Sequence, residues 1–316
     1  MNQSKFSLAD VLTILTALGF GFMCFLGTNF YTLGNVPNSI MIALIITILL
    51  FSTAFTAKLL KRTSVNFKTR FIWEMLLLVL FTMLFVFFTY MPFSHYFTVS
   101  SKSAVIVSKI QTSITQAENM FPEYETYANR RIKRYDGTLE SVLANKLGND
   151  PDYKKYGFKN KFDDKLQRTK KVANITDLLF PTNYSDLKTQ KGIKEVATNW
   201  LLQAKEVTPN WKPIGITNVV VTIEDKSNQW KNILVNLSQI REKGEQTEDF
   251  LYPLNRNFDD IKKYFTTAEN PSLTALLLAL LMWILMMLSW FVTKRHTRFP
   301  GFKLLFGASK ASNNEL

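Results

Sequence analysis

Few side chains in this 316-residue chain are of the types that carry acid–base or metal chemistry. There are two histidines, His95 and His296, and one cysteine, Cys24. A Ser-His-Asp or Cys-His site needs a histidine beside its nucleophile, and a metal site needs several clustered ligands. No glycine-rich phosphate-binding motif occurs either. We therefore predict a protein that is not an enzyme, with no catalytic residues, no metal and no cofactor.

The carboxylates do not form an obvious catalytic pair. Asp163-Asp164 and Asp259-Asp260 are adjacent in sequence, so their side chains diverge on a helix or a strand. Asp10 is expected to cap the first turn of a helix. Glu74, four residues after Arg70, is expected to form an i,i+4 ion pair near one end of an apolar block. The middle of each apolar block lacks charge, which argues against ion transport.

Four apolar blocks frame the chain, at about residues 11–33, 39–60, 71–93 and 272–293. Each has about the 20 residues that a helix needs to cross a membrane. The first block is longer than the apolar core of a signal peptide, so we expect it to be retained. These blocks predict a membrane α-helical protein with four transmembrane helices in a 3+1 arrangement. Its parts are 1–93 with three spans, an outer domain 94–271, a fourth span 272–293 and a tail 294–316.

The basic residues predict the orientation of the spans. Of 38 Lys and Arg residues, 27 lie within 94–271, and the other 11 all fall on one side if the N-terminus is cytoplasmic. We therefore expect cytoplasmic N- and C-termini, a basic cytoplasmic tail and a periplasmic domain, with the chain in a bacterial inner membrane. The net charge of +13 is then largely explained by the basic residues on the cytoplasmic side, which set the topology and are attracted to the lipid bilayer. No nucleic acid partner is therefore expected.

The outer domain is predicted to be mixed α+β and mainly helical. The run 216–224 is rich in β-branched residues and reads as a strand. The run 229–240 fits a helix or a strand, and we favour a strand that pairs back on 216–224. Pro122 is expected to interrupt a helix. A further amphipathic helix is expected over about 185–206.

Two sets of residues in this domain are candidates for contacts with other chains. The first is an apolar seam with 3-4 spacing, which is either an oligomerisation surface or a face that packs on the rest of the domain. The second is a group of aromatic side chains among lysines, which is either a partner-docking site or ordinary core. The seam consists of Val107, Ile110, Ile114, Ala117 and Phe121, and the aromatic group of Tyr153, Tyr156 and Phe158.

Three clustered spans, a large outer domain, a last span and a short basic tail resemble the TssN family. That family is a membrane-complex component of the type VI secretion system of Bacteroidota. The resemblance implies a scaffold subunit that forms oligomers and contacts other envelope secretion-complex subunits. The alternative is a membrane sensor or regulator whose outer domain binds a ligand. The absence of a sizeable cytoplasmic output domain in the predicted topology weakens this alternative.

Overall fold

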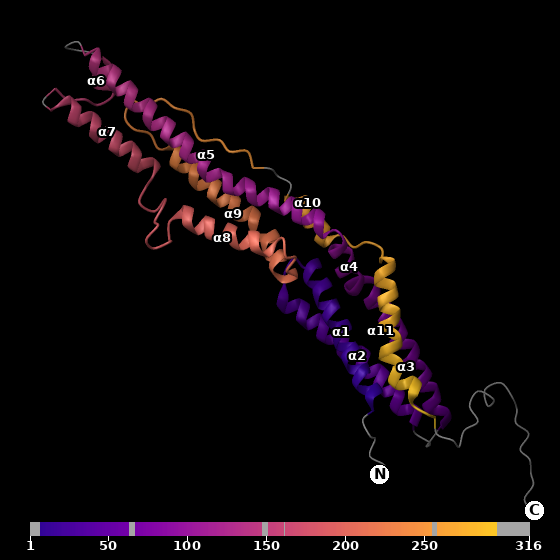
Figure 1. The fold of residues 1–316 in the computed structure, drawn as a ribbon. Coiled ribbons are helices and arrows are strands. Elements are labelled where there is room, and N and C mark those ends of the chain that lie inside the picture. The colour runs from indigo at the N-terminus through magenta and orange to yellow at the C-terminus, as the bar shows by residue number, and fades with distance from the viewer. Residues whose placement is uncertain (1–6, 63–66, 147–150, 161, 255–257, 296–316) are drawn as a thin grey trace, which may run out of the picture. The chain divides into compact units, whose positions relative to one another are not determined.

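The computed structural model describes residues 7–62, 67–146, 151–160, 162–254 and 258–295. It divides into two compact units. Unit 1 joins Met1–Lys102 with Phe265–Leu316, and unit 2 is Ser103–Tyr264. Unit 2 is therefore an insertion in the sequence of unit 1. The described residues form helices, turns and extended segments without a β-strand (Figure 1).

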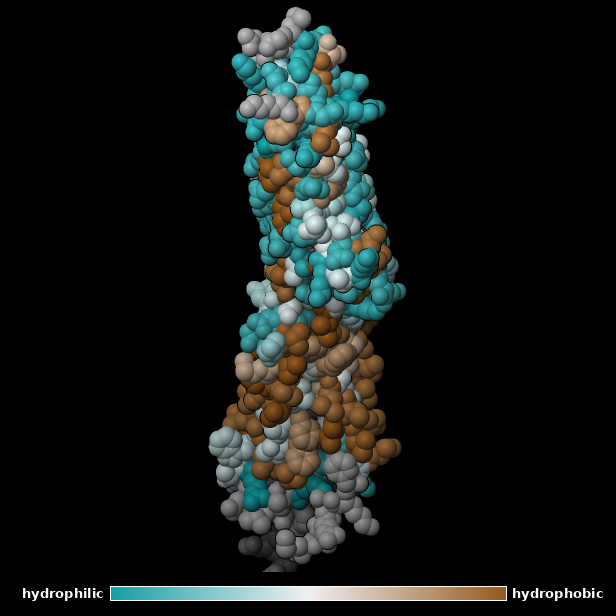
Figure 2. Space-filling model, turned by 90° about the vertical axis from the view of Figure 1, so that its left-hand side faces the viewer, coloured by the Kyte–Doolittle hydropathy of each residue, from teal (hydrophilic) through white to brown (hydrophobic). Residues whose placement is uncertain are grey.

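Unit 1 contains the four predicted spans. They are α1 (Leu8–Tyr31), α2 (Val36–Arg62), a continuous run over Thr69–Ser101, and α11 (Leu273–Val292). The third run comprises all but the first two residues of α3 (Phe67–Phe88), a π-helical turn at Thr89–Phe93 and α4 (Ser94–Ser101). All four are long and apolar enough to cross a membrane, as predicted for a multi-pass membrane protein. On the face that Figure 2 shows, apolar side chains predominate over the spans of unit 1, and hydrophilic side chains are the more frequent in unit 2.

The centre of unit 1 is an aromatic core around α1. The ring of Phe20 lies 4.7 Å from the ring of Phe85 and 4.7 Å from that of Phe93, measured between centroids. Small residues let α2 approach α1 closely. A Cβ on Gly21 would lie 1.9 Å from Thr47 Oγ1, so a larger residue would clash with the Thr47 side chain on α2.

Unit 2 is built on one long helix. It contains α5 (Ser103–Ala144), α6 (Pro151–Lys155), α7 (Asp164–Leu179), α8 (Ile193–Val207) and α9 (Pro213–Gln239). The last helix, α10 (Phe258–Thr266), extends two residues into unit 1. α5 packs against α7, α8 and α9. The interruption predicted at Pro122 is wrong, because this exposed proline lies inside the continuous helix α5.

The predicted α+β character of the outer domain is also wrong. The runs 216–224 and 229–240 both belong mainly to the single helix α9. Their apolar residues recur every three or four positions, so a helix places them on one buried face. Burying them against α5 and α8 outweighs the low helix propensity of β-branched residues, a few tenths of a kcal/mol each. The buried face of α9 includes Ile216, Val219, Val220, Ile223, Trp230 and Leu234.

Candidate functional site

The first candidate site is a polar cluster inside unit 1 that joins three spans. Asp10 lies on the first turn of α1, where its carboxylate accepts a hydrogen bond from the backbone N–H of Ser7 at 2.9 Å. The same carboxylate forms an ion pair with Lys58 on α2 and accepts a hydrogen bond from Ser289 on α11. Asp10 and Lys58 are only 4% and 6% exposed. Asp10 therefore caps its helix, as predicted, and also binds two other helices.

A second cluster lies at the same end of the four spans, where α3 begins and α11 ends. The carboxylate of Glu74, which is fully buried, accepts hydrogen bonds from Arg295 Nη2 at 2.7 Å and from Trp290 Nε1 at 3.0 Å. Lys61 donates to the backbone oxygen of Trp290 at 2.8 Å and lies over its ring. The predicted pair of Glu74 with Arg70 is wrong, because Arg295 is the ion-pair partner of Glu74.

These two clusters account for the acidic residues of the described spans. The other charged side chains of the spans, Arg62 and Arg70, belong to the same end of the helices. The rest of the described length of the four spans holds neither Asp, Glu, Lys nor Arg. Ion-translocating proteins place ionisable groups deep in the membrane. This arrangement instead suits a latch, in which paired charges hold four helices together at one end.

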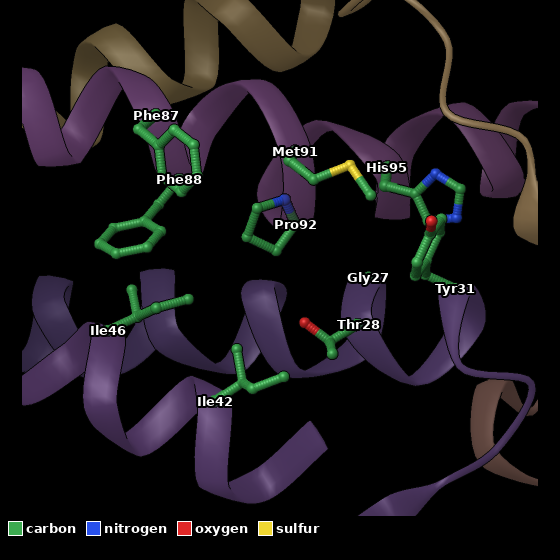
Figure 3. Close-up of a pocket in the computed structure, with 10 residues that line it drawn as sticks. All are labelled: Gly27, Thr28, Tyr31, Ile42, Ile46, Phe87, Phe88, Met91, Pro92 and His95. Carbon is green, nitrogen blue, oxygen red and sulfur yellow. The ribbon is translucent and has the colours of Figure 1, made fainter. Parts of the chain in front are cut away.

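A small apolar cavity lies towards the other end of the spans (Figure 3). Its volume is about 200 Å³. The π-helical turn that contains Pro92 forms part of its wall, and such widened turns often occur at functional sites. A Cβ on Gly27 would lie 1.8 Å from the Pro92 oxygen, so glycine is needed for this approach. The lining residues are Gly27, Thr28, Tyr31, Ile42, Ile46, Phe87, Phe88, Met91, Pro92 and His95.

His95 lines this cavity and holds two segments of unit 1 together. Its Nε2 atom lies 2.6 Å from the backbone oxygen of Phe265, so Nε2–H donates to that carbonyl. The neighbouring ion pair between Lys102 and Glu269 joins the same two segments. These contacts connect the end of the third span to the segment that leads into α11. His95 therefore has a positioning role, and the cavity is lined mainly by apolar side chains.

In unit 2 the main buried charge is Arg131 on α5. Its guanidinium binds both carboxylate oxygens of Glu245, at 2.5 and 2.8 Å, and donates to the backbone oxygens of Ser238, at 2.6 Å, and Ile240. Burial disfavours the charged form of Arg131, but the hydrogen bonds and charge of Glu245 keep its pKa above the usual value. This clamp fixes the end of α9 and the following turn to α5.

An extended segment, Gln246–Leu254, follows the clamp. Phe250 and Tyr252 are buried, while Leu251 between them is exposed. The Tyr127 hydroxyl donates to the backbone oxygen of Glu248 at 2.7 Å. This segment therefore packs alternate side chains onto unit 2 without forming a sheet.

The structure places the two predicted sets of contact residues inside unit 2. Ile110, Ile114, Ala117 and Phe121 are buried, and Val107 is half-buried. This burial agrees with the alternative in which the seam packs on the rest of the domain. An oligomerisation role for the seam stays a prediction.

The aromatic group also has partners within the chain. The rings of Tyr153 and Phe158 stack at 5.1 Å, and the Tyr153 hydroxyl donates to Asp164 at 2.5 Å. Tyr156 is buried beside Tyr135. A docking role for these three residues stays a prediction.

Among the described residues, no group of His, Cys, Asp and Glu is arranged to hold a metal ion. Comparisons of the chain with protein-family models, curated proteins and solved structures found no match.

The latch predicts a large cost when one partner is removed. Asp10→Ala leaves the ammonium group of Lys58 buried without a counter-charge, and we expect a loss of about 3 kcal/mol in the free energy of unfolding. The measurement is unfolding of the full chain in mixed micelles by titration with a denaturing detergent.

Two further variants test whether the pair acts as a unit. In Asp10→Ala with Lys58→Met the buried charge is gone as well, so the double variant should be more stable than Asp10→Ala alone. Ser52→Ala, at an exposed hydroxyl bonded only within α2, serves as the control. Full additivity of the Asp10→Ala and Lys58→Met costs would refute the latch.

The Arg131 clamp predicts a local effect in unit 2. Arg131→Ala leaves the buried carboxylate of Glu245 without its counter-charge and removes one donor from each of two backbone oxygens, with an expected cost of about 3–5 kcal/mol. Arg131→Lys keeps the charge but loses the two-pronged contact, and should fall between wild type and Arg131→Ala. Hydrogen exchange of the full chain should then accelerate over residues 238–252.

The neighbouring Arg130 provides a matched control. It is exposed and has no ion pair among the described residues, so Arg130→Ala should change stability by less than about 0.5 kcal/mol. Equal exchange rates in Arg131→Ala and Arg130→Ala would contradict the clamp.

Proposed function

We propose that this chain is a non-enzymatic scaffold subunit of a membrane assembly. In this proposal unit 1 anchors the protein in a bacterial inner membrane, and unit 2 is held in the periplasm to contact other envelope proteins. The assembly that best fits the domain order is a type VI secretion membrane complex, because the order of spans and outer domain resembles the TssN family.

One observation carries this proposal: the buried charges of the spans are committed to helix–helix contacts at one end of unit 1. Asp10 binds Lys58 and Ser289, and Glu74 binds Arg295 and Trp290. Groups held in this way stabilise an anchor and are not free to relay protons or ions. Unit 2 is joined to this anchor at both ends of its sequence, which suits a domain that is presented to partners.

The third span has the smallest buried share of the four spans. Within its apolar window 17% of residues are buried, against 50% in α1. A groove beside it is lined by residues of α3 and α11, among them Val86 and Trp283. In an assembly we expect this side of unit 1 to contact other transmembrane helices.

The second candidate function is that of a membrane sensor, and the cavity beside His95 favours it. A hydrocarbon-like ligand there would touch α1, α2 and the π-helical turn, next to the contacts that join the two ends of the insertion. Such a ligand would stabilise the purified full chain against unfolding, whereas a scaffold would be stabilised by its protein partners.

The orientation of the spans in the membrane can be tested by cysteine labelling, because the natural cysteine is not expected to react with the label. Cys24 is fully buried, so a membrane-impermeant maleimide should not modify the wild-type chain in intact cells. With the proposed topology, Asn38→Cys and Leu251→Cys should be labelled when only the outer membrane is permeable. Arg62→Cys should be labelled only after the inner membrane is opened. Labelling in the opposite order would reverse the topology.

The scaffold proposal predicts a complex rather than a single chain. After purification in mild detergent, the protein mass should exceed the 36.5 kDa of one chain, and other envelope proteins should co-purify. Deleting the gene should stop contact-dependent effector release. A strict monomer without partners, together with normal release in the deletion strain, would overturn the proposal.

A further inference from the structure

One end of unit 2 is strongly basic although unit 2 as a whole is not. Residues 129–174, which we call the basic end, hold 13 Lys and Arg against six Asp and Glu, a net charge of +7. The remaining 116 residues of unit 2 hold 13 basic and 15 acidic residues. The basic end comprises the last part of α5 together with α6 and most of α7, which lie together in Figure 1. The net positive charge of unit 2 is therefore concentrated at the basic end.

Three carboxylates of this region have cationic partners. Arg168 pairs with Asp136 and Glu140, and Lys146 pairs with Asp164. Most other basic side chains of this region are exposed and form no ion pair within the described part of the chain. These side chains are Arg130, Lys133, Arg134, Lys154, Lys155, Lys159, Lys165 and Lys170. The positive charge of the basic end is thus available to a partner.

Two apolar side chains lie among these lysines. Phe162 is 60% exposed and Leu166 54% exposed, and Lys165 and Lys170 flank Leu166 on the outer surface of α7. The turn that carries Phe162 is held to α7 by Gln167. The amide of Gln167 accepts from the Lys159 N–H at 2.9 Å and donates to the Lys159 oxygen at 3.0 Å. Apolar and basic groups are therefore presented together by a fixed local structure.

We propose that the basic end of unit 2 binds an anionic phospholipid surface. Lysine ammonium groups would contact lipid phosphates, and Phe162 and Leu166 would enter the headgroup region. Six of the eight unpaired basic residues are lysines. Protein interfaces are depleted in lysine and favour arginine, whereas a polybasic surface with exposed aromatic and aliphatic groups is typical of membrane-surface binding. These features favour lipid over an acidic protein, and they do not depend on the scaffold proposal.

The test uses the full chain held in nanodiscs of phosphatidylcholine and measures capture of separate vesicles. Vesicles of phosphatidylcholine mixed with phosphatidylglycerol should be captured, and vesicles of phosphatidylcholine alone should not. Added salt should weaken capture, since exposed charges are screened. Lys165→Glu with Lys170→Glu should weaken it by at least about 20-fold, at roughly a factor of five per basic residue removed. Phe162→Ala with Leu166→Ala should also weaken it.

Matched variants elsewhere in unit 2 serve as controls. Lys188 and Lys191 are exposed without an ion pair among the described residues, and Leu187 and Leu251 are exposed aliphatic residues. Lys188→Glu with Lys191→Glu should keep at least half of the capture, as should Leu187→Ala with Leu251→Ala. Equal capture of both vesicle types would overturn the proposal. So would equal losses in the test and control variants. Binding of acidic proteins but not of anionic vesicles would assign the surface to a protein partner instead.

Discussion

The buried ion pair between Asp10 and Lys58 is the interaction on which the arrangement of the spans depends. A charge in a low-dielectric environment is stable only beside a partner, so this contact permits few alternative packings. Ser289 adds the last span to the pair, although it lies 279 residues from Asp10 in the chain. The Thr13 hydroxyl supports the same junction by donating to the Met286 oxygen at 3.1 Å. Polar contacts therefore select which helices meet, and the aromatic core around Phe20 then fills the space between them.

The same physical rule operates in unit 2, which also contains a buried charge at a non-local junction. Arg131 donates to the backbone oxygen of Ser238 in the last turn of α9, to that of Ile240 just beyond the helix, and to the carboxylate of Glu245 in the following turn. The last carbonyl groups of a helix lack partners within that helix, and a guanidinium group can serve several of them at once. The direction in which the chain leaves α9 is thereby fixed, which allows Phe250 and Tyr252 to pack as they do.

Hydropathy predicted the four spans because their length and lack of charge directly reflect the solvent in which they lie. It did not predict that Lys58 and Arg295 would be the partners of Asp10 and Glu74, since such pairs depend on how helices pack. The helix α9 was missed for a related reason. Ile216 to Ile223 are individually suited to a strand, and only the three- and four-residue spacing that continues to Trp230 and Leu234 indicates a helix. Tyr153, Tyr156 and Phe158 were candidates for docking because burial cannot be read from residue type alone.

The pairing of His95 with Phe265, and of Lys102 with Glu269, has a thermodynamic consequence for the inserted unit. These contacts bring together the two points at which the chain leaves and rejoins unit 1, so unit 2 is a closed loop of 162 residues. A loop with joined ends has far fewer unfolded conformations than a free chain. A covalent crosslink around a loop of this size stabilises the folded state by about 5 kcal/mol. Unit 2 has no cysteines, so it has no disulfide bond to limit its unfolded conformations. Contacts within the helical bundle of unit 1 instead hold its two ends together, and they thereby reduce the conformational entropy of its unfolded state.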